Sequence, residues 1–95
     1  MKLTEARKLF YELRQQGKIK IIYHAIHDHL ERGFSRAELF YLVSETTGRL
    51  SHNDKFPTSV PDSFFYECKD SAKRNVEIAL VLEDNIIVIH AFRKV

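Results

Sequence analysis

Apolar residues near the start of the chain recur at helical spacing, at Leu3, Ala6, Phe10 and Leu13. This spacing predicts an amphipathic helix over residues 4–16, because positions three and four apart share one face of a helix. Thr4 is a residue type that caps helix starts, and Gly17 suits the left-handed conformation that ends many helices. We therefore expect one helix with an apolar face, closed at Gly17.

The next stretch predicts a strand and two further helices. In "KIKIIYH", isoleucines alternate with lysines, which is typical of a strand and leads the chain to His24. Apolar positions four apart, followed by a glycine, indicate a short helix over residues 25–32. Ser35 and Glu38 form the capping-box pattern, so a third helix is expected over residues 36–46.

The second half of the chain changes to the period of strands. Strand-like segments, separated by turn residues, cover residues 50–52, 63–69, 76–83 and 86–93. If Asp84 and Asn85 form a two-residue turn, the last two segments pair as a hairpin. Counting outward from that turn pairs Glu83 with Ile86, Leu82 with Ile87, Val81 with Val88, Leu80 with Ile89, Ala79 with His90, Ile78 with Ala91 and Glu77 with Phe92.

These pairs give the hairpin two different faces. The pairs that include Leu82, Leu80 and Ile78 are wholly apolar and suit a face covered by helices. The opposite face mixes apolar residues with His90 and Glu77, so it is a candidate binding surface. The chain is therefore predicted to be an α+β protein, with an antiparallel sheet of about four strands and the N-terminal helices packed on one face.

Composition narrows the class of protein. Ninety-five residues, 44% hydrophobic and 29% charged, indicate one globular domain over residues 1–95. The net charge of +2 permits a nucleic-acid partner without requiring one. Cys68 is the single cysteine, which excludes an internal disulfide and suggests a reducing compartment. We found no apolar targeting or membrane-spanning stretch, so a cytoplasmic protein without membrane contact is expected.

The segment "YHAIHDHLERG" concentrates histidines beside an aspartate. His24, His27 and Asp28, three and four positions apart, would share a helix face and supply metal ligands only if all converged. Neither "HExxH" nor a Cys/His ladder is present, so no metal is expected. Metal binding by these three residues stays an alternative. No phosphate-binding glycine loop or dinucleotide motif occurs, so no cofactor is expected either.

The same segment carries a family resemblance. "HAIHDHLERGFS" resembles the opening of a small bacterial domain-of-unknown-function family, which has His-Ala, an Arg four residues after the His, and then Arg-Gly-Ile-Ser. Phe34 stands for the Ile, and Asp28 replaces the first Arg. The ending "NIIVIHAFRK" is similar to the closing strand of that family. The match covers residues 19–94, so the helix within residues 1–17 is expected to be an addition to the family core.

The resemblance implies kinship with the BrnT and RelE/ParE toxins, compact sheet-and-helix proteins. RelE- and BrnT-type members cut RNA, whereas ParE-type members poison gyrase. It implies a toxin-like protein that engages RNA and is held by an antitoxin covering the open face of the sheet. Because Asp28 places an anion where a cation would help to bind phosphate, it puts the ribonuclease activity in question.

Cutting RNA without a metal requires a base for the 2′-hydroxyl proton, an acid for the leaving oxygen, and cations for the phosphate charge. Each candidate also has a structural alternative, such as a cross-strand pair between His90 and Glu77. The candidate acid and base are His24 and His90, the candidate cations are Arg32 and Arg93, and the candidate RNA-backbone contacts are Lys73, Arg74 and Lys94.

Two other functions stay open. One is a non-enzymatic protein-binding module of the same fold, a homodimer included, that has lost catalysis and uses Phe92, Val88 and Val81 as its partner patch. The weak net charge and Asp28 favour this alternative over an enzyme. The other is a metal-dependent enzyme built on the histidine segment.

Overall fold

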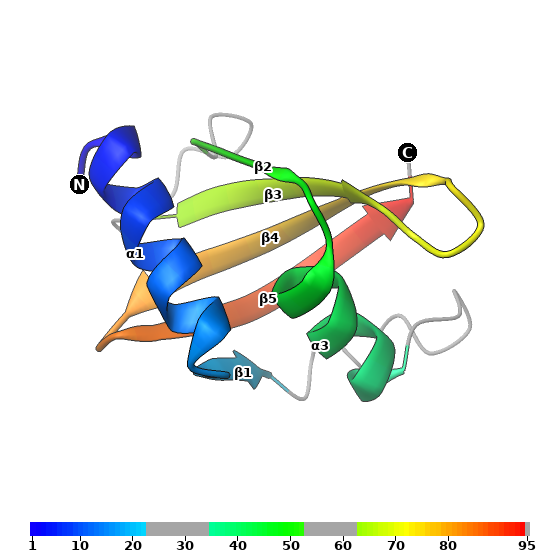
Figure 1. Cartoon of the computed structure of the whole chain (residues 1–95), viewed down its shortest axis with the longest axis horizontal. Helices are drawn as coiled ribbons and strands as arrows, with labels where there is room; N and C mark the ends of the chain where they lie inside the picture. The colour runs from blue at the N-terminus through cyan, green and yellow to red at the C-terminus, as the bar shows by residue number, and fades with distance from the viewer. Residues whose placement is uncertain (23–34, 53–62, 95) are drawn as a thin grey trace.

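The computed structural model describes residues 1–22, 35–52 and 63–94 (Figure 1). The predicted helix over residues 25–32 lies outside these ranges. The described elements follow the predicted order closely. They are α1 (Leu3–Gln15), β1 (Ile19–Ile21), α3 (Arg36–Glu45), β2 (Arg49–His52), β3 (Ser63–Lys69), β4 (Asn75–Glu83) and β5 (Ile86–Lys94).

The strands form one mixed sheet in the order β1-β5-β4-β3-β2. The four strands from β2 to β5 are antiparallel to their neighbours, but β1 lies parallel to β5. The prediction of an antiparallel sheet of about four strands is therefore wrong in strand number and in its edge. The cause is a non-local pairing: the first strand joins the last one, and no local periodicity encodes that contact.

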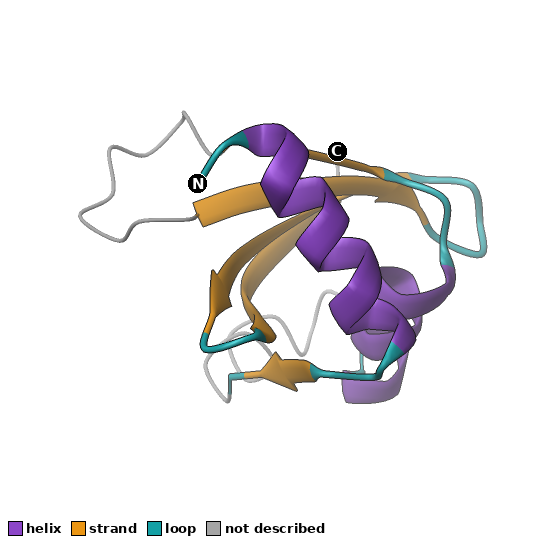
Figure 2. Cartoon of the chain, turned by 60° about the vertical axis from the view of Figure 1, so that its left-hand side comes forward, coloured by secondary structure: helices purple, strands orange, loops and turns teal. Residues whose placement is uncertain are grey.

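Both helices pack on the same face of the sheet (Figures 1 and 2). The hydrophobic core lies between them and the strands, and α1 contributes Ala6, Phe10 and Leu13 to it, each at most 3% exposed. The N-terminal helix is thus part of the core and not a detached appendage. We call the opposite side of the sheet the far face. None of the helices that the structure describes is long and apolar enough to cross a membrane.

The helix ends follow local capping rules. Gly17 has φ +69°, the left-handed conformation predicted for it, and Lys18 N–H donates to the Leu13 carbonyl at 3.0 Å across the helix end. At α3, Ser35 and Glu38 form the predicted capping box. The predicted capping by Thr4 is wrong because α1 begins at Leu3, which puts Thr4 inside the first turn.

The final hairpin begins as predicted. Asp84 and Asn85 have φ of 51° and 58°, as a two-residue turn of the type that suits twisted strands requires. The four pairs nearest the turn have the predicted register. These are Glu83 with Ile86, Leu82 with Ile87, Val81 with Val88, and Leu80 with Ile89.

Beyond these pairs a β-bulge changes the register. Ala79 pairs with Ala91 instead of His90, so His90 is the extra residue of β5. Each later pair is shifted by one position: Ile78 pairs with Phe92, and Glu77 pairs with Arg93. The three predicted pairs Ala79–His90, Ile78–Ala91 and Glu77–Phe92 are wrong for this reason. The bulge brings Phe92 into the core, where it is 3% exposed.

Candidate functional site

The bulge completes a row of charged residues across the far face. Arg49 of β2 pairs with Glu67 of β3, Glu67 pairs with Glu77 of β4, and Glu77 pairs with Arg93 of β5. We call these four residues the charged row. Two acidic positions therefore stand side by side between two basic ones, on four successive strands.

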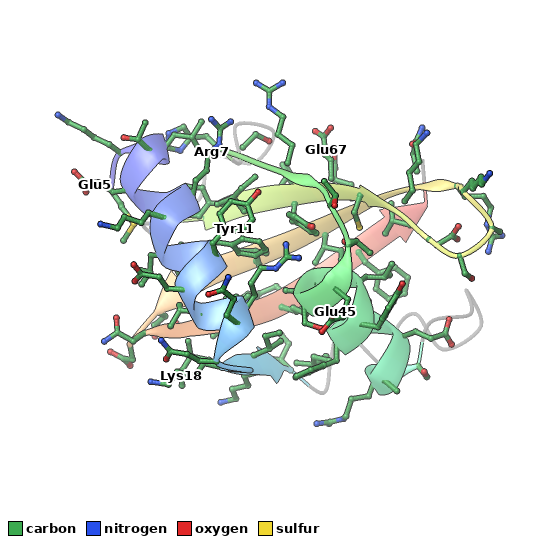
Figure 3. All side chains as sticks on the ribbon, in the orientation of Figure 1. Glu5, Arg7, Tyr11, Lys18, Glu45 and Glu67 are labelled. Atoms are coloured by element: carbon green, nitrogen blue, oxygen red, sulfur yellow. The ribbon has the colours of Figure 1, made fainter. Side chains whose placement is uncertain are left out.

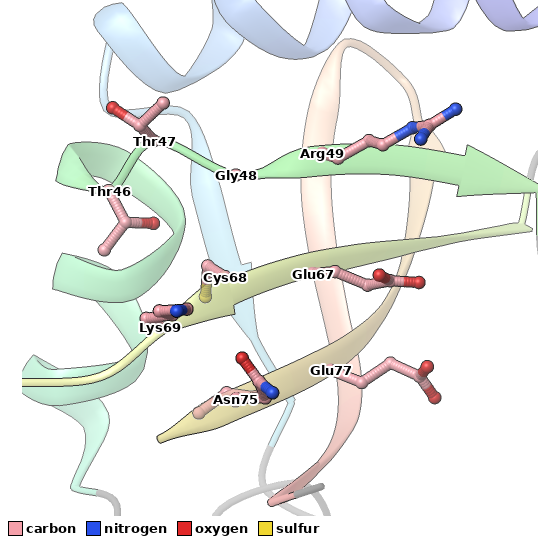
Figure 4. Close-up of a pocket in the computed structure, with 10 residues that line it drawn as sticks. Thr46, Thr47, Gly48, Arg49, Glu67, Cys68, Lys69, Asn75 and Glu77 are labelled. Carbon is pink, nitrogen blue, oxygen red and sulfur yellow. The ribbon is translucent and has the colours of Figure 1, made fainter. Parts of the chain in front are cut away.

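The two carboxylates of the row have different surroundings. Glu67 is exposed, whereas Glu77 is 7% exposed. Figure 4 shows both side chains extending in the same direction from neighbouring strands. Like charges on directly opposed residues destabilise a sheet, and the strand register places a basic position on the outer side of each glutamate. A buried carboxylate beside another is an arrangement more typical of a site than of a solvated surface.

His90 lies on β5, the strand that contributes Arg93 to this row. It is half-buried at the bulge, beside Ala91, and these two residues oppose Ala79 of β4. Ala79 is two positions along β4 from Glu77, so Ala91 is the diagonal neighbour of Glu77 and His90 lies one position further along β5. Bulges often re-aim a side chain next to an active site. The predicted site on the final hairpin stays a prediction, with His90 and Glu77 on neighbouring strands but not in the predicted register.

A cavity of about 840 Å³ opens where the row meets the end of the sheet. Arg49, Glu67 and Glu77 line it, together with Lys69 and the adjoining Cys68 (Figure 4). Cys68 is buried, on the same face of β3 as Phe64 and Tyr66. Burial raises the pKa of its thiol, although a hydrogen bond with the Thr46 side chain acts in the opposite direction. The thiol is therefore a poor nucleophile in this cavity.

The predicted RNA contacts lie at the same end of the sheet. Lys73 and Arg74 belong to the turn between β3 and β4, and the register pairs Lys94 with Val76 just after that turn. Asp70 organises the turn, since its carboxylate accepts the Arg74 backbone N–H at 2.8 Å and the Arg74 Nε at 2.9 Å. The backbone hydrogen bond from Arg74 is the main cause that lowers the pKa of Asp70.

Several predicted site residues lie outside the part of the chain that the structure describes. His24 and Arg32, and also His27 and Asp28, lie outside the described residues. The structure describes the strand pairing of the other two, since Arg93 pairs with Glu77 and Lys94 pairs with Val76. Within residues 1–22, 35–52 and 63–94, we find no group of three or more potential metal ligands.

Tyr66 has a structural role at the junction of α1, α3 and β3. It is 1% exposed, and its hydroxyl donates to the Thr46 carbonyl at 2.7 Å. The Arg14 guanidinium donates to the Tyr66 hydroxyl at 3.2 Å, and to the carbonyls of Thr46 and Ser44 at 2.8 and 3.1 Å. This network ties α1 to the end of α3 and to β3.

Gly48 completes that junction. A Cβ at this position would lie 2.6 Å from Tyr66 Cζ and would also collide with the Glu67 carbonyl oxygen. Only glycine therefore allows β2 to start this close to β3.

Sequence reasoning missed Arg49 and Glu67. The available signal was the alternation of Glu67 with the apolar residues of its strand segment, but nothing local showed that it pairs with Arg49. Comparison of the chain with protein-family models, with curated proteins and with solved structures finds no match.

Proposed function

We propose that the protein is a toxin-like, RNA-interacting protein that cuts RNA without a metal, and that the charged row and His90 form the cleavage site. The observation that carries the proposal is the bulge in β5. It supports a site because it pairs Glu77 with Arg93 and leaves His90 as the extra residue of the same strand, on the other side of Ala91 and Phe92 from Arg93. The finer fold expectation, a RelE/BrnT-like architecture, is part of the same proposal.

In the proposed reaction the 2′-hydroxyl oxygen attacks the adjacent phosphorus and the bond from phosphorus to the 5′ oxygen breaks. Glu77 takes the 2′-hydroxyl proton, and protonated His90 donates a proton to the leaving 5′ oxygen. The products are a 2′,3′-cyclic phosphate and a 5′-hydroxyl end. Arg49 and Arg93 stabilise the negative charge that gathers on the phosphate oxygens.

The predicted roles of His24 and Arg32 stay predictions within this proposal. Lys73, Arg74 and Lys94 would hold the RNA backbone beyond the site, because they share the end of the sheet where the cavity opens. An antitoxin that covered the far face would block both the acid–base pair and the cavity. A cytoplasmic location would suit such a pair of proteins.

Cleavage of single-stranded RNA by the purified protein tests the proposal. We expect cleavage that persists in a metal chelator, and a rate at least about 100-fold lower in His90→Ala and in Glu77→Gln, because general acid–base catalysis contributes that much. His24→Ala in the same assay tests the other predicted acid or base.

His52→Ala is the matched control. His52 is another strand histidine, exposed where His90 is half-buried, and its ring stacks on Phe64 with centroids 5.4 Å apart. The His52→Ala variant should cleave RNA at the wild-type rate. Cleavage that His90→Ala leaves intact, or that the chelator abolishes, would contradict the proposed chemistry.

A second candidate is a non-enzymatic protein-binding module, with a protein partner or a second copy on the far face. The half-buried residues Ala79, Val88 and Ala91 favour it, because they lie outside the core cluster under the helices. Val81, predicted for the partner patch, and the neighbouring Phe65 are only 6% exposed. Phe92, predicted for this patch, is in the core instead and is not part of it. Loss of self-association or partner binding in Val88→Asp, without any RNA cleavage by the wild type, would favour this candidate.

A further inference from the structure

A second cavity lies on the other side of β2 from the charged row. It is a crevice of about 320 Å³ between α1 and β2, close to the lower limit of typical ligand pockets. Arg7, Phe10 and Tyr11 line it from α1, Gly48, Arg49 and Leu50 from β2, and Tyr66 from β3. Figure 3 shows Arg7 and Tyr11 on the side of α1 that faces β2.

The crevice is basic. Two arginines line it, and no carboxylate is among its lining residues within the described chain. Arg7 is held in place because its Nε donates to the Leu50 carbonyl oxygen at 3.1 Å. That bond uses one nitrogen of the guanidinium and leaves its two terminal nitrogens as donors, a geometry that suits phosphate oxygens.

The crevice also has an aromatic wall. Tyr11 is 47% exposed, although most large apolar side chains of α1 are buried. Phe10 meets its ring edge-on with centroids 6.0 Å apart, and the Arg14 guanidinium carbon lies 5.4 Å from its centroid. These contacts fix the ring without covering it, so it can stack on a planar group.

Arg49 connects the two cavities. It lines both the crevice and the larger cavity of the charged row, and it is exposed. A strand of RNA that crosses the edge at β2 would therefore pass from one cavity to the other beside the same guanidinium. Base stacking on a tyrosine and phosphate contacts to arginines are the two interactions that bind single-stranded RNA.

We propose that the crevice between α1 and β2 binds one nucleotide of the RNA strand, with its base against Tyr11 and its phosphate on Arg7 and Arg49. This inference rests on the proposed function, because it takes the same RNA as ligand. It goes further in assigning a binding subsite where Tyr11 and Arg7 contribute affinity and not chemistry, while Arg49 is shared with the cleavage site.

Binding of a fluorescent, 2′-O-methylated RNA oligonucleotide, which cannot be cleaved through its 2′ oxygen, tests the inference by anisotropy. We expect Tyr11→Leu to weaken binding about tenfold, the effect of losing one stacked base. Tyr41→Leu is the matched control, because Tyr41 is a helix tyrosine that is 53% exposed and does not line the crevice. It should bind like the wild type.

The outcomes separate this inference from the proposed function. Equal binding by Tyr11→Leu and Tyr41→Leu overturns the crevice subsite, even if the wild type cleaves ordinary RNA. Weaker binding by Tyr11→Leu alone supports the subsite, even if no RNA is cleaved. If the wild type does not bind the oligonucleotide, the subsite is overturned. Arg49→Gln gives a second readout: a smaller salt dependence of binding is expected if its guanidinium contacts phosphate.

Discussion

On the face of the sheet under the helices, β3 and β4 present Phe64, Tyr66, Cys68, Val76, Ile78, Leu80 and Leu82, all at most 6% exposed. On the far face the same two strands carry Glu67, Lys69, Asn75, Glu77 and Glu83 beside a few apolar residues. The two faces alternate residue by residue, so the same backbone supports both. Stability and the candidate function can therefore be changed separately by substitutions on opposite faces of one strand.

The largest difference is expected between apolar residues on the two faces. Phe64 is fully buried in the core, so Phe64→Ala should cost about 3–5 kcal/mol of unfolding free energy through lost transfer energy and a cavity. Val88 is half-buried on the far face, so Val88→Ala should cost about 1 kcal/mol or less. Urea unfolding of both variants measures the costs. Similar losses of stability would mean that the far face is packed as tightly as the core.

A smaller contrast is expected between two arginines. Arg14 donates to two carbonyls at the end of α3 and to the Tyr66 hydroxyl, so Arg14→Gln should cost about 1.5–3 kcal/mol by leaving these acceptors without their charged donor. Arg49 is exposed, and we see no hydrogen bond or ion pair between its side chain and another described residue. Arg49→Gln should change stability by at most about 0.5 kcal/mol.

The order of the two variants should be reversed in an RNA-binding assay, where Arg49→Gln should have the larger effect. Arg49→Gln is expected to weaken binding more than folded Arg14→Gln, which loses only the guanidinium beside the Tyr11 ring, at a temperature well below the melting point of the variant. If Arg14→Gln weakens binding as much as Arg49→Gln, the separation of a structural and a functional arginine fails.

The sequence predicted the covered face better than the far one. Helical and strand periods identified Phe10, Leu13, Leu42 and Ile78 as core residues, because burial of one face repeats at regular spacing. The bulge was missed because periodicity assumes a regular ladder. In the regular register Phe92 lies on the far face, whereas one extra residue at His90 buries its ring with the core.

The charged row was out of reach for a related reason. It joins residues of four strands. Each pairing depends on the register between two strands, and the sequence of neither strand specifies that register. His90 and Glu77 were identified from one hairpin, because strand pairs can be counted outward from the two-residue turn at Asp84. Arg49 and Glu67 needed a pairing across a long loop, and loop length gives no register.

The smallest effect is expected at the turn between β3 and β4, which carries the basic residues next to the charged row. The Arg74 backbone N–H lowers the pKa of Asp70 in the folded protein below its usual 3.8. The folded state therefore binds this proton less readily than the unfolded chain, and the stabilisation is complete above pH 3.8 and is lost as the pH falls through the folded pKa. Asp70→Asn should melt lower than wild type at pH 7, by a margin that shrinks below about pH 4.

Arg74→Gln separates the two kinds of contact in this turn. It removes the ion pair of 2.9 Å but keeps the backbone N–H that donates to Asp70 at 2.8 Å. Because that backbone bond is the main cause of the lowered pKa, Arg74→Gln should retain most of the pH dependence that Asp70→Asn abolishes. Thermal melts of the three proteins at pH 7 and pH 3 measure it. A pH dependence lost equally in both variants would assign the stabilisation of this end of the far face to the guanidinium instead of the turn backbone.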